Sequence, residues 1–120
     1  MDKIGEFVLT LLHAATNTHI LHLQSQSYSE HMALGSFYEE LPDLVDSLVE
    51  AMQGKYGTIL EYPQMYFLPS ATGLEELQAL NDYVMQGRQD LPQDSEIQNQ
   101  VDEIASLIDS CLLYTSDAAD

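Results

Sequence analysis

Apolar residues recur at helical spacing along most of the chain. Between residues 2 and 23 they fall at Ile4, Val8, Leu11 and Ala15, in steps of four and three, which predicts an amphipathic helix. From residue 28 to residue 53 the steps again alternate between three and four, as in a helix-bundle seam. The members of this second stripe are His31, Leu34, Tyr38, Leu41, Val45, Leu48 and Met52.

Capping residues and glycines predict where the helices begin and end. Ser27 with Glu30, and Thr72 with Glu75, have the spacing of capping boxes at helix starts. Helices are therefore expected at 28–53, with a kink or split at Pro42, and at 72–86. Gly54 and Gly87 are natural stops. A fourth helix is expected from Ser95, with an apolar stripe at Ile97, Val101, Ile104 and Ile108.

Residues 54–71 break the helical pattern with glycines, prolines and aromatic residues. A connection of this length is expected to pack against the helices, because long connections without secondary structure are uncommon in compact domains. It would cross the bundle and leave the second and third helices parallel. No strand pattern occurs along the sequence, so we expect an all-α fold, a four-helix bundle with one long crossover.

Residues 111–120 resemble the in-frame translation of a sequencing adapter, CLLYTSDAAD. We therefore expect a native domain at residues 1–110, a non-native tail at 111–120, and a truncated fourth helix. Cys111, Tyr114, Asp117 and Asp120 would then not be biological. The single cysteine already excludes an internal disulfide.

The chain of 120 residues carries 20 acidic and only 3 basic side chains, for a formal net charge of −17. Without the tail it has 18 acidic and 3 basic residues, and a charge of −15. So few cations exclude sequence-independent binding to nucleic-acid phosphates, and anionic membranes would repel the surface. No apolar run is long enough to span a membrane, and no signal peptide opens the chain. A cytoplasmic protein is expected.

Three histidines fall on converging apolar stripes near the link between the first two helices. His19 and His22 are spaced i, i+3 and can face one point, and His31 begins the stripe of the next helix. Satisfied core or interface histidines and metal ligands are about equally consistent with this pattern. His13 lies at the edge of the stripes and is expected to face solvent.

A second stripe on the 28–53 helix is acidic, with Glu39, Asp43, Asp46 and Glu50 at steps of four and three. A solvated face explains such a stripe on pattern alone, whereas carboxylates clustered around a cation would form a metal site. His31 and Asp46 are separated by about 22 Å along one straight helix, so they cannot bind the same ion within one chain. A shared site would need two antiparallel copies of this helix across a two-fold axis.

The stretch from His19 to Glu50 resembles the Dps-like branch of the ferritin-like superfamily. The spacing His19-x11-His31-x14-Asp46-x3-Glu50 matches that family, although Gly35 stands where the family has a metal-binding aspartate. A second and closer resemblance is to uncharacterised ferritin-like proteins of tailed phages. They share a pattern that here reads His19, His22, Leu23, Ser27, His31, Tyr38, Asp46, Glu50 and Gln53-Gly54.

The resemblance implies a ferritin-like bundle that binds iron, or another divalent metal, at the interface of a homodimer or larger homo-oligomer. His19 and His31 would come from one subunit and Asp46 and Glu50 from the other, with His22 as a ligand or supporting partner. Any enzymatic step would be ferroxidase chemistry, the oxidation of Fe(II). The alternative is a non-enzymatic phage accessory or structural protein that keeps the bundle without metal chemistry. A phage-encoded chain would act in the host cytoplasm.

Overall fold

The computed structural model of the chain describes the backbone of residues 2–119 and the side chains of residues 3–115. Its long helices are α1 (Asp2–Gln24), α2 (Tyr28–Tyr56), α3 (Gly73–Gly87) and α4 (Ser95–Ala119), with a short 3-10 turn, η1 (Arg88–Asp90), between the last two. No strand occurs in the part of the chain that the structure describes. The expectation of an all-α, four-helix fold is confirmed.

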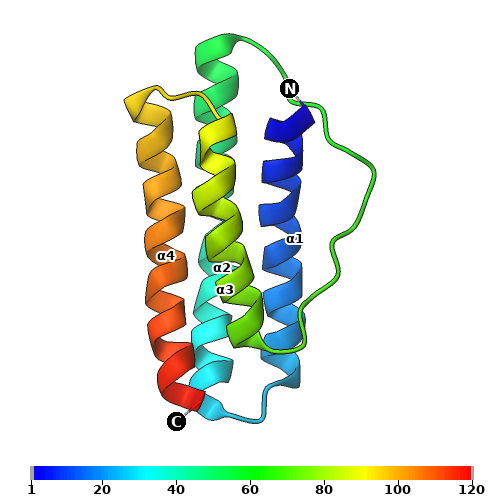
Figure 1. Cartoon of the computed structure of the whole chain (residues 1–120), viewed down its shortest axis with the longest axis vertical. Helices are drawn as coiled ribbons and strands as arrows, with labels where there is room; N and C mark the ends of the chain where they lie inside the picture. The colour runs from blue at the N-terminus through cyan, green and yellow to red at the C-terminus, as the bar shows by residue number, and fades with distance from the viewer. Residues whose placement is uncertain (1, 120) are drawn as a thin grey trace.

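The four helices form a bundle whose two middle helices run in the same direction (Figure 1). The chain descends α1, ascends α2, returns through the long 57–72 crossover outside α1, ascends α3 and descends α4. Helix α2 packs against α1 and α4, and α3 packs against the same two helices. The crossover therefore places α2 and α3 parallel, as the long connection predicted.

The core consists of the apolar stripes that the sequence pattern predicts. On α2 the buried residues recur in steps of three and four. They are Leu34, Phe37, Leu41, Val45, Leu48 and Met52. On α4 the stripe Ile97, Val101, Ile104 and Ile108 is fully buried. Burial of these side chains is the main force that holds the helices together.

The helix starts follow the capping signals. The hydroxyl of Ser27 accepts a hydrogen bond from the backbone N–H of Glu30, and the hydroxyl of Thr72 accepts one from Glu75. Helix α2 continues past both Pro42 and Gly54 as one element. It ends at Tyr56 because Gly57 takes a left-handed conformation (φ 66°) and donates its N–H to the Gln53 carbonyl. Of the kink or split expected at Pro42, the split does not occur, and the expected stop at Gly54 is wrong.

Helix α4 is not truncated, and this corrects the sequence-based expectation. It runs through residues 111–115 to Ala119, and Cys111 and Thr115 continue its buried stripe at steps of three and four. The thiol of Cys111 contacts the Ala33 carbonyl of α2 across 3.4 Å. The segment therefore extends the helix whatever its origin, while Asp117 and Asp120 lie outside the described side chains.

The crossover is fastened to α1 by side chains of both segments. Asn17 donates its amide to the Phe67 carbonyl, and Tyr66 donates its hydroxyl to the amide oxygen of Asn17. His13 accepts the backbone N–H of Phe67 at Nδ1 (3.1 Å) and lies against the ring of Tyr66. His13 is thus half-buried under the crossover, so the expectation that it faces solvent is wrong.

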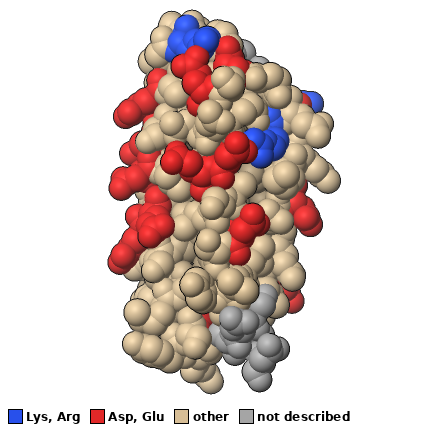
Figure 2. Space-filling view, turned by 90° about the vertical axis from the view of Figure 1, so that its left-hand side faces the viewer, with Lys and Arg blue, Asp and Glu red and all other residues tan. Residues whose placement is uncertain are grey.

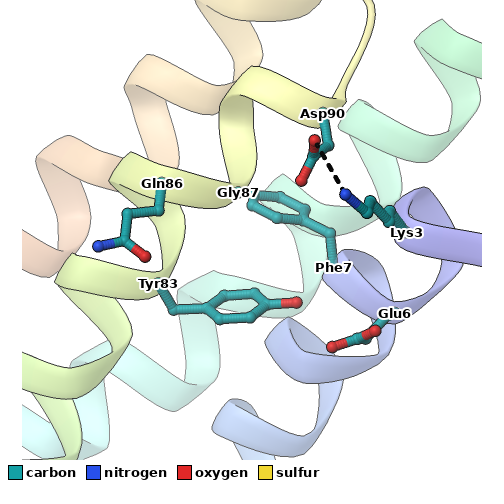
Figure 3. Close-up of a pocket in the computed structure, with 7 residues that line it drawn as sticks. All are labelled: Lys3, Glu6, Phe7, Tyr83, Gln86, Gly87 and Asp90. Atoms are coloured by element: carbon teal, nitrogen blue, oxygen red, sulfur yellow. Dashed lines mark ion pairs between the residues drawn. The ribbon is translucent and has the colours of Figure 1, made fainter.

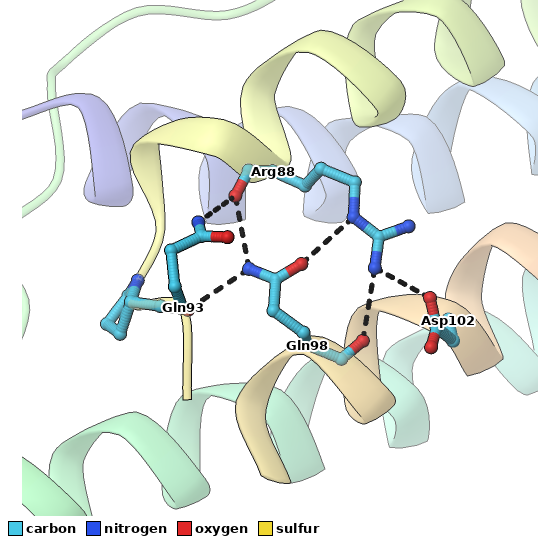
Figure 4. Close-up of polar contacts among 5 residues, drawn as sticks. Arg88, Gln93, Gln98 and Asp102 are labelled. Atoms are coloured by element: carbon cyan, nitrogen blue, oxygen red, sulfur yellow. Dashed lines mark hydrogen bonds and ion pairs between the residues drawn. The ribbon is translucent and has the colours of Figure 1, made fainter. Parts of the chain in front are cut away.

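One end of the bundle, which we call the charged end, holds all three basic residues in ion pairs. Lys3 pairs with Asp90, Lys55 with Asp94 and Glu96, and Arg88 with Asp102. Arg88 also bonds Gln98 and so ties η1 to α4 (Figure 4). Acidic side chains gather over the upper part of the face in Figure 2 and are sparse at the lower end.

Candidate functional site

The link between α1 and α2 brings His22 and His31 into direct contact. Their rings stack with centroids 3.7 Å apart and planes inclined by 19°. Nδ1 of His22 lies 2.5 Å from the carbonyl oxygen of His31, and Nδ1 of His31 lies 2.8 Å from the carbonyl oxygen of His22. His22 stands in the last turn of α1, where carbonyls lack helical partners, so His31 caps this helix end.

This pairing fixes the proton on each imidazole. A carbonyl oxygen can only accept a hydrogen bond, so Nδ1 of both rings must be the protonated, donating nitrogen. In the neutral ring, Nε2 then keeps its lone pair. Neither Nε2 has a hydrogen-bond partner among the described residues, and neither is sealed from solvent. Each chain therefore presents two imidazoles in the form that binds metal ions, oriented by bonds from the opposite nitrogen.

His19 stands beside this pair on the exposed side of α1. Its ring stacks on Tyr38 of α2, with centroids 4.0 Å apart and planes nearly parallel. The ring of His22 lies to the side of this stack, 6.3 Å from the ring of His19 and 5.3 Å from that of Tyr38. The structure thus brings together all three predicted histidines, and we call this group with Tyr38 the histidine corner.

Gly35 leaves room for the ring of His22 in the histidine corner. A Cβ atom at this position would lie 3.0 Å from Cε1 and 3.2 Å from Nδ1 of His22. The ring therefore rests over the α2 backbone in space that any other residue would fill. The sequence shows Gly35 only as a missing carboxylate, whereas the structure shows that the imidazole of His22 packs closely against this glycine.

Asp46 and Glu50 lie elsewhere on the same helix. Both are exposed, as are Glu39 and Asp43 of the acidic stripe. Helix α2 is continuous between His31 and Asp46, so the separation of about 22 Å holds. Within one chain the described residues contain no group of three His, Cys, Asp or Glu side chains that could hold a metal ion. The histidines and the carboxylates form two separate groups.

Two other groups with metal-binding chemistry are already engaged. Because the Phe67 N–H donates to Nδ1 of His13, the proton of that ring sits on Nε2, the opposite tautomer to that of His22. Burial raises the pKa of the Cys111 thiol to about 11, so it remains a protonated core group at neutral pH. His13 and Cys111 are therefore less suited to bind a metal ion than His22 and His31.

A pocket of about 220 Å³ opens between α1 and the end of α3 at the charged end (Figure 3). The Lys3–Asp90 ion pair stands at its rim, and Phe7 and Tyr83 stack inside it with ring centroids 5.8 Å apart. Burial raises the pKa of the Tyr83 hydroxyl above its ordinary value. Lys3 is paired with Asp90, and Glu6 adds a second, exposed carboxylate to the lining of the pocket.

The chain belongs to a family of unknown function, DUF5856, whose sequence profile matches residues 22–114. The match includes His22, His31, Gly35, Asp46 and Glu50, and begins after His19. Comparisons with curated proteins and with solved structures find no match to this chain. No helix among the described residues is long and apolar enough to cross a membrane.

Proposed function

We propose that the protein binds iron, or another divalent metal ion, at a two-fold interface between two copies of the chain. The observation that carries the proposal is the reciprocal bonding of His22 and His31 through Nδ1, which leaves Nε2 of both rings without a hydrogen-bond partner among the described residues. Oriented imidazoles of this kind are common metal ligands. In a single chain they make only half of a coordination shell.

The other half would come from a partner chain. Asp46 and Glu50 are exposed one turn apart on α2, and they supply the oxygen ligands that Fe(II) and Mn(II) accept. Two antiparallel copies of α2 would set these carboxylates opposite the histidine corner of the other subunit. The site would then be ferritin-like, of the Dps type, and iron would be its cargo or substrate.

In this proposal His22 takes over the role of the ligand that Gly35 lacks. Any side chain at position 35, including the aspartate of the Dps-like family, would press on the present ring of His22 and require it to shift by a few tenths of an ångström. His22 therefore joins His31 as the nearest pair of nitrogen ligands, with His19 beside them. Oxidation of bound Fe(II) by oxygen or peroxide is a further step of the same proposal.

Metal binding to the purified protein tests the proposal. Wild type, His31→Ala and Asp46→Ala would be equilibrated with Fe(II) under anaerobic conditions, and separately with Zn²⁺, then dialysed and analysed for bound metal. We expect wild type to hold metal as a dimer or larger assembly in sedimentation, and both variants to lose it. Asp43→Ala, on the same acidic stripe, and His13→Asn are the matched controls and should bind as wild type does.

One observation favours the alternative of a non-enzymatic phage accessory or structural protein. The described residues of a single chain assemble no three-ligand site. If wild type binds no more metal than a His31→Ala/Asp46→Ala double variant, the metal proposal is wrong and the structural role stands.

A further inference from the structure

A second cavity, also of about 220 Å³, lies under the crossover between α1 and α3. Ala14, Leu68 and Leu80 form apolar walls, and Asn17, Glu76 and Tyr83 supply polar groups. Tyr83 also lines the pocket in Figure 3, where its ring extends from α3 toward α1. Pockets for drug-sized ligands usually exceed about 300 Å³, so this cavity suits a smaller molecule.

Glu76 is the unusual residue of this cavity. It is 8% exposed and is the sole carboxylate among the buried residues that the structure describes. Its Oε1 atom accepts the backbone N–H of Ser70 across 2.8 Å. Its Oε2 atom has no hydrogen-bond partner within residues 3–115 and is not sealed off by neighbouring atoms. Glu76 is one of the residues that line the cavity, so this oxygen is the accessible acceptor of its lining carboxylate.

No lysine or arginine among the described residues pairs with this carboxylate. The ion pairs of Lys3, Lys55 and Arg88 all lie at the charged end, with other acids. Glu76 stands in the first turns of α3, whose N-terminus favours negative charge, but that effect is weaker than a direct charged hydrogen bond. A buried carboxylate with one open oxygen, walled by apolar side chains, is a receptor for a positive group.

We propose that this cavity binds a small alkylammonium ion. The ammonium would donate to Oε2 of Glu76, and a short alkyl chain would lie against Ala14, Leu68 and Leu80. A divalent metal ion fits poorly, because one carboxylate among apolar walls cannot supply six or more oxygen ligands. The cavity shares no residue with the histidine corner, so this proposal is independent of the metal proposal.

Titration with n-butylammonium chloride, followed by NMR of the full-length protein, tests the inference. We expect saturable shifts at Asn17, Glu76 and Tyr83, and at least about tenfold weaker binding of n-butanol, which has the same chain without the charge. Glu76→Gln keeps an oxygen for the Ser70 N–H and removes the charge, so it should weaken butylammonium binding at least about tenfold. Glu75→Gln removes an exposed charge from the same turn and should change nothing.

A protein with so many acids also attracts cations without a site, and the variants separate the two cases. Equal losses in Glu76→Gln and Glu75→Gln, or shifts spread along the acidic stripe of α2, would overturn the proposal. If Glu76→Gln does not fold, Ala79→Leu serves instead, because Ala79 lines the cavity mouth without touching the Ser70 bond. Unchanged butylammonium binding in that variant would also overturn it.

Discussion

The two ends of the bundle are fastened by different chemistry. At the charged end, Lys3, Lys55 and Arg88 join neighbouring helices through ion pairs with exposed acids. At the histidine corner, no Lys, Arg, Asp or Glu takes part, and His22 and His31 join α1 to α2 through stacking and hydrogen bonds to backbone.

The difference shows how an acidic chain separates its charged groups from its uncharged histidines. Its three cations are used to relieve repulsion at one end, where exposed pairs are weak and screened by salt. The segment that carries His19 and His22 is itself uncharged, because residues 7–29 contain no Lys, Arg, Asp or Glu. Oriented lone pairs, which attract metal ions, are found there.

The largest change in the free energy of unfolding is expected from His22→Ala. The change removes the ring stacked on His31 and the hydrogen bond to the His31 carbonyl, so the free energy of unfolding should fall by about 2 kcal/mol. His19→Ala, which removes an exposed ring stacked only on Tyr38, is the control and should cost about 0.5–1 kcal/mol. Urea unfolding measures both. Equal losses, or a His22→Ala loss that shrinks in high salt, would contradict the account.

Gly35→Ala should change the free energy of unfolding by a smaller amount, and the sign of this change should depend on whether His22 is present. In wild type the new Cβ meets a ring held by a hydrogen bond, so we expect a loss of about 1 kcal/mol. In the His22→Ala background the space is free, and the better helix propensity of alanine should instead stabilise by about 0.5–1 kcal/mol. Urea unfolding of wild type, the two single variants and the double variant measures this double-mutant cycle. If Gly35→Ala changes the free energy of unfolding with the same sign in both backgrounds, the contact between position 35 and the His22 ring is unimportant.

The smallest effect concerns the charged end. The hydroxyl of Tyr56 donates to Asp94, and this bond, with help from Lys55, lowers the pKa of the Asp94 carboxyl below its ordinary value of 3.8. Asp94 thus contributes stability above pH 3.8, and that contribution is lost as the pH falls through the lowered pKa. Tyr56→Phe should raise the pKa of Asp94 toward 3.8 in an NMR titration. An unchanged pKa would mean that the bond does not form in solution.

Most of the fold was predictable because its signals are local. The stripes of α2 and α4 lie within single helices, and the caps at Ser27 and Thr72 involve residues three positions apart. The true end of α2 was missed because Gly57, rather than Gly54, takes the left-handed conformation. The full length of α4 was not predictable from the resemblance of residues 111–120 to a non-native tail, although Cys111 and Thr115 continue the buried periodicity of the helix.

The candidate site was predictable only in part, since its geometry depends on contacts between distant segments. Spacing identified His19, His22 and His31, and the structure brings them together. Spacing could not show that Gly35 is open for the ring of His22, or that His13 meets Phe67, 54 positions away. The pairing of the histidines with Asp46 and Glu50 stays a prediction, because it involves a second copy of the chain.

Mixing two inactive chains tests the shared metal site most directly. A His22→Ala/His31→Ala chain would be combined in equal amounts with an Asp46→Ala/Glu50→Ala chain, and bound Fe(II) or Zn²⁺ measured after subunit exchange. Neither variant alone should bind metal. In the mixture, half of the dimers are mixed and each holds one intact site of two, so we predict about a quarter of the wild-type capacity. A mixture that binds no more metal than either variant alone would contradict the account.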